Sequence, residues 1–448
     1  MTATLRFAGT AGLLAALTLA ACGVEETGVP PIEYDAEGRA IGDTFAPLYY
    51  PIGIAPHPDG RYLFIANAGF DRRYNAGTVA VYDTARRQFS PDLAVSIGLF
   101  AGDLVAGRTP PEEPGGEPGP VQLFVATRDS SELWRIVVAE EAGEVVGLSA
   151  TATRDFGDGS MSPEPYGLAL DADGQGLIMT HTANGTVSRY STRGEVWEAL
   201  DPTTGQPAPF RCAAGVHEGA TVVARHPVNG WWYVSDRFSP FIKMVEEVSE
   251  APAGADPVTG PCSLGQVASG VFRVEPLDND SRSRGLAFSR DGSLMYVAQY
   301  AIGSSGGSLR VFDTTVAPNG RPANRVLKVI GLGTRPNLVR VAGCRPDRCP
   351  PGTTPDSLDA KGQGLVYVTA FHSDELFVVD PASLSIVARI PMPDGPHDVV
   401  FMLDDAGRMR GYVTNFNDNS LSVLDLEPGS PTRFTVSATI KPELPEAP

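Results

Sequence analysis

Gly395-Pro-His-Asp-Val-Val-Phe401, Tyr412-Val-Thr-Asn415 and Ser420-Leu-Ser-Val-Leu-Asp425 follow one another near the end of the chain and decide its fold. Each segment is short and rich in β-branched and aromatic residues, and the turn-forming Asp404-Asp-Ala-Gly407 separates the first two. Runs of this kind, bounded by turn residues, are typical of β-strands. The unit is therefore predicted to be a small antiparallel sheet, whose fourth and outer strand is Arg433–Ile440.

The same order of segments recurs along the whole chain. Near the start, Pro51-Ile-Gly-Ile-Ala55 is followed by Phe64-Ile-Ala-Asn67 and Gly77-Thr-Val-Ala-Val-Tyr-Asp83. Further copies are marked by Phe124–Thr127, Ile178–His181, Tyr233–Asp236, Tyr296–Gln299 and Tyr367–Ala370. Repeated four-stranded units pack radially, which leaves few exposed sheet edges. The sequence therefore predicts an all-β fold, a seven-bladed β-propeller of four-stranded antiparallel blades over residues 45–441. Pro- and Gly-rich insertions are predicted to be loops on the blades, at 107–120, 201–216, 251–265, 315–325 and 343–362.

The Tyr412–Asn415 unit, with the following Asn417–Asp425, resembles the YVTN-type propeller repeat. That repeat occurs in YncE-like periplasmic proteins and in surface-layer propellers, and the resemblance covers residues 45–441. It implies the seven-bladed fold but says little about function, because this architecture carries binding proteins, enzymes and scaffolds alike. The last repeat supplies its own outer strand, so the residues show no clear interlocking strand donated by the N-terminus, and the sequence leaves open how the ring closes.

The N-terminus predicts export and lipid attachment. Arg6 precedes an apolar run over Phe7–Ala21, which is too short to span a bilayer and has the proportions of a signal peptide. The run ends in Leu19-Ala-Ala-Cys22, which resembles a bacterial lipobox, so residues 1–22 are predicted to be a lipoprotein signal with Cys22 as the acylated (palmitate-bearing) residue. The alternative is an ordinary signal peptide. Residues 23–44 are predicted to be a flexible tether and 442–448 a C-terminal tail. The expected location is the cell envelope, at the outer membrane if the source is Gram-negative.

Charge and cysteine content narrow the partners. The 448-residue chain has a formal net charge of −18, which disfavours nucleic acid as a partner and leaves the lipid anchor as the expected membrane contact.

Besides Cys22 there are four cysteines, an even number that suggests two disulfides in an exported chain. Cys344 and Cys349 lie close enough to close their own loop, and by elimination Cys212 pairs with Cys262, placed in loops before and within the fourth blade. A metal site is the rival, but the chain has no CxxC motif.

The repeat also predicts a candidate binding face. In a propeller, the start of the first strand and the end of the second strand of each blade share one face, so two rings of residues meet there. The first ring comprises Ile52, Gly102, Tyr166, Ala220, Arg284, Asn337 and His397. The second comprises Asn67, Thr127, His181, Asp236, Gln299, Ala370 and Asn415, with Arg128, Asp129, Arg237 and His372 at the rim. The residues singled out as ligand-binding are Tyr166, His181, Asp236, Arg284, Gln299, Asn337, His397, Asn67 and Asn415.

These side chains suit an anionic or polyol ligand, because Arg and His donate to oxygen atoms and Asp236 could orient an imidazole. The alternative is that the polar residues at strand ends cap turns. No catalytic residue is identified: Gly303-Ser-Ser-Gly-Gly307 lacks the nucleophile-elbow spacing, and no CxxCH motif for haem is present. Calcium is a weak option at Asp278–Ser281 and Asn417–Asn419.

The leading functional hypothesis is a monomeric, non-catalytic scaffold of the cell envelope. It would bind an envelope protein or a small polar ligand. One alternative is a lactonase-like hydrolase that uses the channel face. The other is an accessory protein of a periplasmic redox system. No cofactor is predicted.

Overall fold

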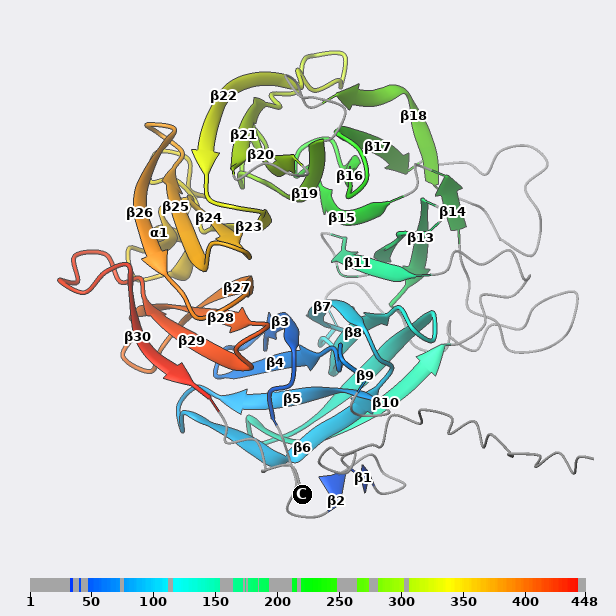
Figure 1. The fold of residues 1–448 in the computed structure, drawn as a ribbon, viewed down its shortest axis with the longest axis vertical. Coiled ribbons are helices and arrows are strands. Elements are labelled where there is room, and N and C mark those ends of the chain that lie inside the picture. Colours follow the sequence, from blue (N-terminus) through cyan, green and yellow to red (C-terminus); the bar gives the residue numbers. More distant parts are fainter. Residues whose placement is uncertain are drawn as a thin grey trace, which may run out of the picture.

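The apolar runs of the repeat form strands that pair only with their neighbours in the chain. The computed structural model describes residues 33–34, 40–41, 47–72, 76–111, 116–153, 164–171, 174, 176–183, 185–192, 212–215, 219–247, 264–273, 281–301 and 306–441. Seven antiparallel four-stranded sheets, each made of consecutive strands, are arranged in a ring around one central axis (Figure 1). The predicted seven-bladed β-propeller is confirmed.

Four blades come from the first part of the chain, and each runs from the channel outward. Blade 1 contains β3 (Pro51–Pro56), β4 (Tyr62–Asn67), β5 (Gly77–Asp83) and β6 (Gln88–Ile97). Blade 2 contains β7 (Ala101–Arg108), β8 (Val121–Thr127), β9 (Glu132–Glu141) and β10 (Glu144–Thr153). Blade 3 contains β11 (Pro165–Leu170), β12 (Gly176–His181), β13 (Thr186–Ser191) and β14 (Cys212–Gly215). Blade 4 contains β15 (Ala220–Arg225), β16 (Trp232–Asp236), β17 (Phe241–Glu247) and β18 (Leu264–Arg273).

The other three blades complete the ring. Blade 5 contains β19 (Ser281–Phe288), β20 (Leu294–Ala301), β21 (Gly307–Asp313) and β22 (Arg325–Leu332). Blade 6 contains β23 (Pro336–Ala342), β24 (Leu365–Ala370), β25 (Glu375–Asp380) and β26 (Ser385–Pro391). Blade 7 contains β27 (Pro396–Leu403), β28 (Met409–Asn415), β29 (Ser420–Asp425) and β30 (Thr435–Ile440). The predicted outer strand of the last repeat is thus present as β30.

The hydrophobic core lies between the faces of adjacent blades. Phe124 of blade 2 packs with Leu168 and Met179 of blade 3, and comparable clusters fill the other seams. The inner strands approach so closely that a side chain does not fit at Gly285, where a Cβ atom would lie 2.5 Å from the Asn337 carbonyl oxygen of the next blade. Glycine at this position therefore lets blades 5 and 6 meet at the channel.

The ring closes by packing and hydrogen bonds between blades 7 and 1, which are neighbours in space (Figure 1). Tyr412 of β28 lies in one buried cluster with Ile54 of β3. The backbone N–H of Tyr50 donates to Oδ1 of Asn419 across a distance of 2.6 Å. In the described part of the chain each blade consists of four consecutive strands, which answers the question of ring closure that the sequence left open.

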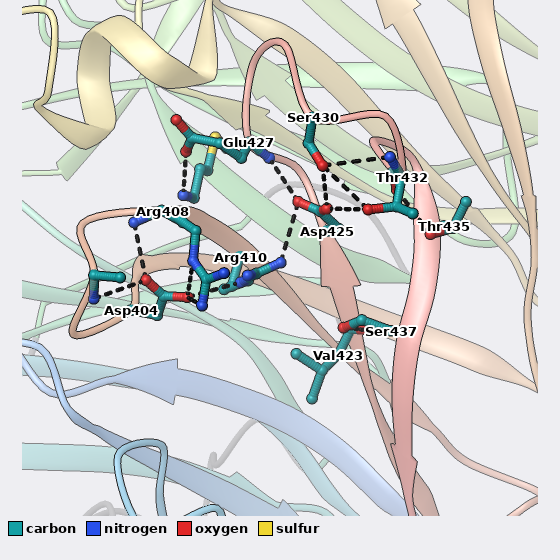
Figure 2. Close-up of polar contacts among 12 residues, drawn as sticks. Asp404, Arg408, Arg410, Val423, Asp425, Glu427, Ser430, Thr432, Thr435 and Ser437 are labelled. Atoms are coloured by element: carbon teal, nitrogen blue, oxygen red, sulfur yellow. Dashed lines mark hydrogen bonds and ion pairs between the residues drawn. The ribbon is translucent and has the colours of Figure 1, made fainter.

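A polar network holds the turns of blade 7 on the face opposite the start of β27. Figure 2 shows Asp404 accepting from the guanidinium groups of Arg408 and Arg410. Arg410 also reaches Asp425 at 3.1 Å, and Asp425 accepts hydroxyl hydrogen bonds from Ser430 and Thr432. These groups therefore join the β27–β28 turn to the β29–β30 turn of the last blade.

Several details differ from the sequence-based expectations. Two short strands, β1 (Glu33–Tyr34) and β2 (Ala40–Ile41), pair within the predicted tether, and the 343–362 insertion contains a short helix, α1 (Leu358–Gly362). Cys212 is not in a loop before blade 4 but begins β14 of blade 3, because residues 212–215 pair with β13. No helix in the described residues is long and apolar enough to cross a membrane.

The structure tests one of the two predicted disulfides. Cys344 and Cys349 form the predicted disulfide in the β23–β24 connection. Cys262 lies outside the described residues, so its pairing with Cys212 stays a prediction. Cys22, the signal peptide and the tail are also outside the described residues.

Candidate functional site

A β-bulge at the same place in every blade shapes the channel face. In blade 1, Pro51 pairs with Asn67, and the register then shifts so that Ile52 has no partner on β4. The same shift follows Ala101 of β7, Pro165 of β11, Ala220 of β15, Ser283 of β19, Pro336 of β23 and Pro396 of β27. A bulge bends its strand and redirects the side chains of the unpaired residues. The bulge residues are therefore presented to the channel.

These bulges position most of the first ring as the sequence predicted. Tyr166, Arg284, Asn337 and His397 are bulge residues, and all four line one cavity of about 240 Å³ at the mouth of the channel, as does Ile52. Blade 4 is an exception, because Ala220 pairs with Asp236 and the equivalent bulge residue is Thr221. We call this space the channel-mouth cavity; the rest of its lining is Ala68, Phe70, Arg128, Arg237, Tyr300, Arg335, Pro336, Phe371, His372 and Phe416.

Arginine side chains dominate one part of the channel-mouth cavity. Arg128, Arg237 and Arg284 come from blades 2, 4 and 5, and none of them forms an ion pair with a carboxylate of the described residues. The pKa of Arg237 is lowered by burial and then by the charges of Arg284 and Arg128. Like charges this close repel one another, so the site is electrostatically prepared for an anion.

Aromatic rings hold these guanidinium groups in place. The guanidinium carbon of Arg128 lies 5.5 Å from the centre of the Tyr166 ring. Arg284 and Arg335 lie on the Tyr300 ring at 5.6 and 5.7 Å. Such cation–π contacts orient a guanidinium group without using its hydrogen-bond donors. The donors of Arg128 and Arg284 thus stay available to a ligand, whereas Nη1 of Arg335 contacts Nε2 of His372 at 2.9 Å.

Two further residues offer unused polar atoms. His397 donates from Nδ1 to the backbone oxygen of Ile52 at 3.1 Å, which leaves Nε2 as an acceptor. Burial, and then the charge of Arg284, lowers the pKa of His397 to about 3, so its ring is neutral. Asn337 is only 8% exposed, and its Nδ2 has no hydrogen-bond partner in the described part of the chain. A buried amide donor without a partner is costly and points to a ligand.

Beneath the channel-mouth cavity lies a buried charged group of three residues. Arg340 donates to Asp398 at 2.8 Å, and Asp103 of β7 lies close enough to feel both charges. Burial raises the pKa of Asp103 to about 6, and its Oδ2 accepts from the Leu168 backbone N–H at 3.3 Å. The Arg340 side chain lies within the ring of blades, and 32% of its surface remains accessible from the channel. Asp103 is thus a carboxyl group that can change its charge near neutral pH.

The second ring is placed differently from the first. None of its residues lines the channel-mouth cavity. The side-chain amide of Asn67 donates to the backbone oxygen of Pro47 and to the hydroxyl of Thr78, and its oxygen accepts from the N–H of Tyr49. The side-chain carboxylate of Asp236 accepts from the N–H groups of Phe238 and Ser239. The others contact their own blades: His181 contacts Ser188, Gln299 contacts Arg310, and Asn415 contacts Ser420 and Ser422. These side chains satisfy turns and strands, which is the alternative that the sequence left open.

The residue that follows each second-ring position was not singled out as a ligand-binding residue from the sequence. These positions are Ala68, Arg128, Thr182, Arg237, Tyr300, Phe371 and Phe416, and all but Thr182 line the cavity. Side chains alternate along a strand, so the residue that faces into the blade is followed by one that faces the channel. Arg128 and Arg237 were expected at the rim; Tyr300, Phe371, Phe416, Phe70 and Arg335 were missed. The alternation could have indicated Tyr300, Phe371 and Phe416, whereas Phe70 and Arg335 lie in loops beside the strands, where the repeat gives no such signal.

The metal-ion candidates are already bound to protein groups. Asp418 pairs with Lys441 at 2.6 Å and Asn419 accepts from Tyr50, while residues 278–280 lie outside the described residues. Another group, His57, Asp59 and Glu140, lies at the opposite end of blades 1 and 2. There Arg108 binds both carboxylates, so a cation is already provided by the chain.

The comparisons with known proteins support the fold alone. Over 90% of this chain and 98% of the other, it resembles a candidate 6-phosphogluconolactonase from Bacteroides fragilis, with a TM-score of 0.51 and 12% identity. The periplasmic gluconolactonase PpgL of Pseudomonas aeruginosa gives a TM-score of 0.50 at 16% identity, over 85% of this chain and 93% of that one. Hydrazine synthase of Kuenenia stuttgartiensis gives 0.49 at 15% identity, over 88% and 99%.

No protein-family model and no curated protein sequence matches the chain. The sheet topology and the structural neighbours show the seven-bladed propeller. Membership of the YVTN or YncE-like family stays a prediction.

Proposed function

We propose that this propeller binds a small anionic ligand in the channel-mouth cavity. The observation that carries the proposal is the group Arg128, Arg237 and Arg284, which lines the cavity without a carboxylate partner among the described residues. The chain as a whole has a net charge of −18, so this group is a local exception to an acidic surface. Holding three cations together destabilises the folded protein, and an anion bound between them would offset their repulsion.

The shape of the site favours a small molecule over a protein partner. The cavity is concave and measures about 240 Å³. That volume is just below the ~300–1,000 Å³ typical of drug-sized ligand sites. Nε2 of His397 and Nδ2 of Asn337 add one acceptor and one donor, which suits a ligand with a hydroxyl or carbonyl group beside its anionic group.

Calorimetric titration with citrate at constant ionic strength tests this proposal, with glycerol as an uncharged control. We expect saturable binding of citrate that Arg284→Gln weakens about tenfold or more, since hydrogen bonds to charged groups contribute ~1.5–3 kcal/mol. Arg325→Gln is the matched control, because Arg325 is on the outer strand of the same blade and 71% exposed. If neither citrate nor inorganic phosphate binds saturably at millimolar concentration, the proposal is wrong.

We also infer that the protein binds its ligand in the cell envelope. This rests on the lipobox-like Leu19–Cys22 and the short apolar run before it. Mass spectrometry of the protein from its own cells would then find an acylated N-terminal peptide that begins at Cys22. Recovery of an unmodified Cys22 peptide from the membrane-free fraction would contradict the lipid anchor.

A hydrolase that acts on lactones is the second candidate, and one observation favours it. Asp103 lies beneath the cavity with a pKa raised to about 6, near the value that suits a general base at neutral pH. A lactone hydrolysis screen with the protein and its Asp103→Asn variant separates the two readings. Turnover that Asp103→Asn abolishes would favour the hydrolase, and binding without turnover favours a binding protein.

A further inference from the structure

The channel-mouth cavity has two chemically different walls. The arginine wall, Arg128, Arg237 and Arg284, comes from blades 2, 4 and 5. The aromatic wall, Phe70, Phe371 and Phe416, follows the second strands of blades 1, 6 and 7. Blades 6, 7 and 1 are consecutive around the ring (Figure 1), so the apolar rings gather on one side of the channel.

The three rings of the aromatic wall form one continuous surface. The ring centre of Phe416 lies 5.6 Å from that of Phe70 and 5.8 Å from that of Phe371. Tyr50 supports Phe416 from behind the turn, at 5.0 Å. These tilted and edge-on contacts are favourable for aromatic pairs and fix the orientation of the wall.

Part of the aromatic wall is open to solvent. Phe70 is 51% exposed, although Phe416 beside it is 8% exposed. Apolar surface that stays in water on a concave wall costs free energy, which burial against an apolar ligand would recover. An inorganic anion would contact only the arginine wall and leave Phe70 exposed.

We propose that the ligand of this site is an amphipathic organic acid. Its carboxylate, sulfonate or phosphate group would lie on the arginine wall, and an aromatic or acyl body would cover Phe70 and Phe416. This inference rests on the proposed anion-binding function and adds the chemical class of the ligand. The two walls act together: the guanidinium groups supply the charge, and the rings exclude water from the bound anion and strengthen its interactions.

Titration with a matched series of probes tests the inference on the full chain. The series is 2-naphthoate, 2-naphthalenemethanol as the uncharged molecule with the same body, and inorganic phosphate as an anion without an apolar body. We expect 2-naphthoate to bind about tenfold or more tightly than either of the others, because each lacks one of the two contacts. Equal affinity for phosphate and 2-naphthoate would overturn the amphipathic ligand and leave the anion site intact. If none of the three binds, and citrate does not bind, the proposed function itself fails.

Variants of Phe70 separate the aromatic wall from a general effect on folding. Phe70→Ala should weaken 2-naphthoate binding about five- to tenfold, and phosphate binding should not change. Phe70→Leu keeps an apolar surface and should recover part of the affinity. Val387→Ala is the matched control, since Val387 is similarly exposed (47%) but lies on β26, at the outer edge of blade 6. If Phe70→Ala leaves the affinity for 2-naphthoate unchanged while the melting temperature is normal, Phe70 does not contact the ligand and the inference is wrong.

Discussion

His397 donates through its Nδ1 to the backbone oxygen of Ile52 at 3.1 Å, which joins the first strand of the last blade to the first strand of the first blade. The two residues are 345 positions apart in the chain. Thr414 donates to the same oxygen at 3.3 Å. One residue thus lines the channel-mouth cavity and closes the ring, which couples ligand binding to the stability of the seam.

Replacing His397 by Leu should destabilise the protein by about 1–2 kcal/mol, because a buried hydrogen bond across the seam is lost. Urea unfolding at pH 7.5 measures this. The pKa of His397 is lowered from its usual 6.5 to about 3, so the unfolded chain takes up this proton first as the pH falls. The stability that His397 contributes is present above pH 6.5 and is lost as the pH falls toward 3. The variant should therefore lie closer to the wild type at pH 5 than at pH 7.5, and a constant difference would contradict the assignment.

Replacing Asp103 by Asn should have the opposite pH dependence. Burial raises the pKa of Asp103 to about 6, so the folded protein binds this proton more tightly than the unfolded chain. Its contribution to stability is largest at low pH and is lost as the pH rises through 6. Asp103→Asn removes that loss, and its amide oxygen can still accept from Leu168. The melting temperature of the variant, relative to the wild type, should be higher at pH 7.5 than at pH 5; a reversed order would show that Arg340 already neutralises Asp103.

Replacing Asn337 by Asp should trade ligand affinity for stability. The new carboxylate would lie in the arginine-lined cavity and act there as a built-in anion. We expect the free energy of unfolding to rise by about 1–2 kcal/mol and the affinity for citrate to fall about tenfold, because charge-assisted hydrogen bonds form within the chain. Asn337→Ala is the control, since it removes the amide without adding charge and should not raise stability. Tighter citrate binding by Asn337→Asp would contradict the electrostatic account.

Removing the Cys344–Cys349 disulfide should cost little. The bridge closes a loop with a sequence separation of five, and loop-closure entropy predicts a loss of about 2 kcal/mol for so short a loop. The double variant Cys344→Ala with Cys349→Ala should melt at a slightly lower temperature, measured by circular dichroism. Its citrate affinity should equal that of the wild type, because the loop follows β23 on the face opposite the cavity. A change in affinity would reveal a coupling between the two faces.

The sequence indicated the architecture well because the repeat is a local signal. Tyr412–Asn415 and its equivalents alternate apolar and small residues within single strands, and turn residues separate them. Such patterns predicted the blades, the outer strand β30 and the Cys344–Cys349 bridge, all of which the structure contains. The sequence also placed Tyr166, Arg284, Asn337 and His397 on the channel face, because they occupy a fixed point at the start of the first strand of each repeat.

The composition of the site was decided by the tertiary structure. The bulge in each inner strand and the alternation at the end of each second strand select which of two adjacent residues faces the channel, so Phe416 lines the cavity and Asn415 does not. The lack of an ion pair between Arg128, Arg237 or Arg284 and a carboxylate of the described residues is equally invisible in a sequence with an excess of acidic residues. Which charges meet depends on seven blades from distant parts of the chain closing around one axis. The sequence by itself therefore determined the ring, and only the closed ring brought four arginines and three phenylalanines to the same cavity.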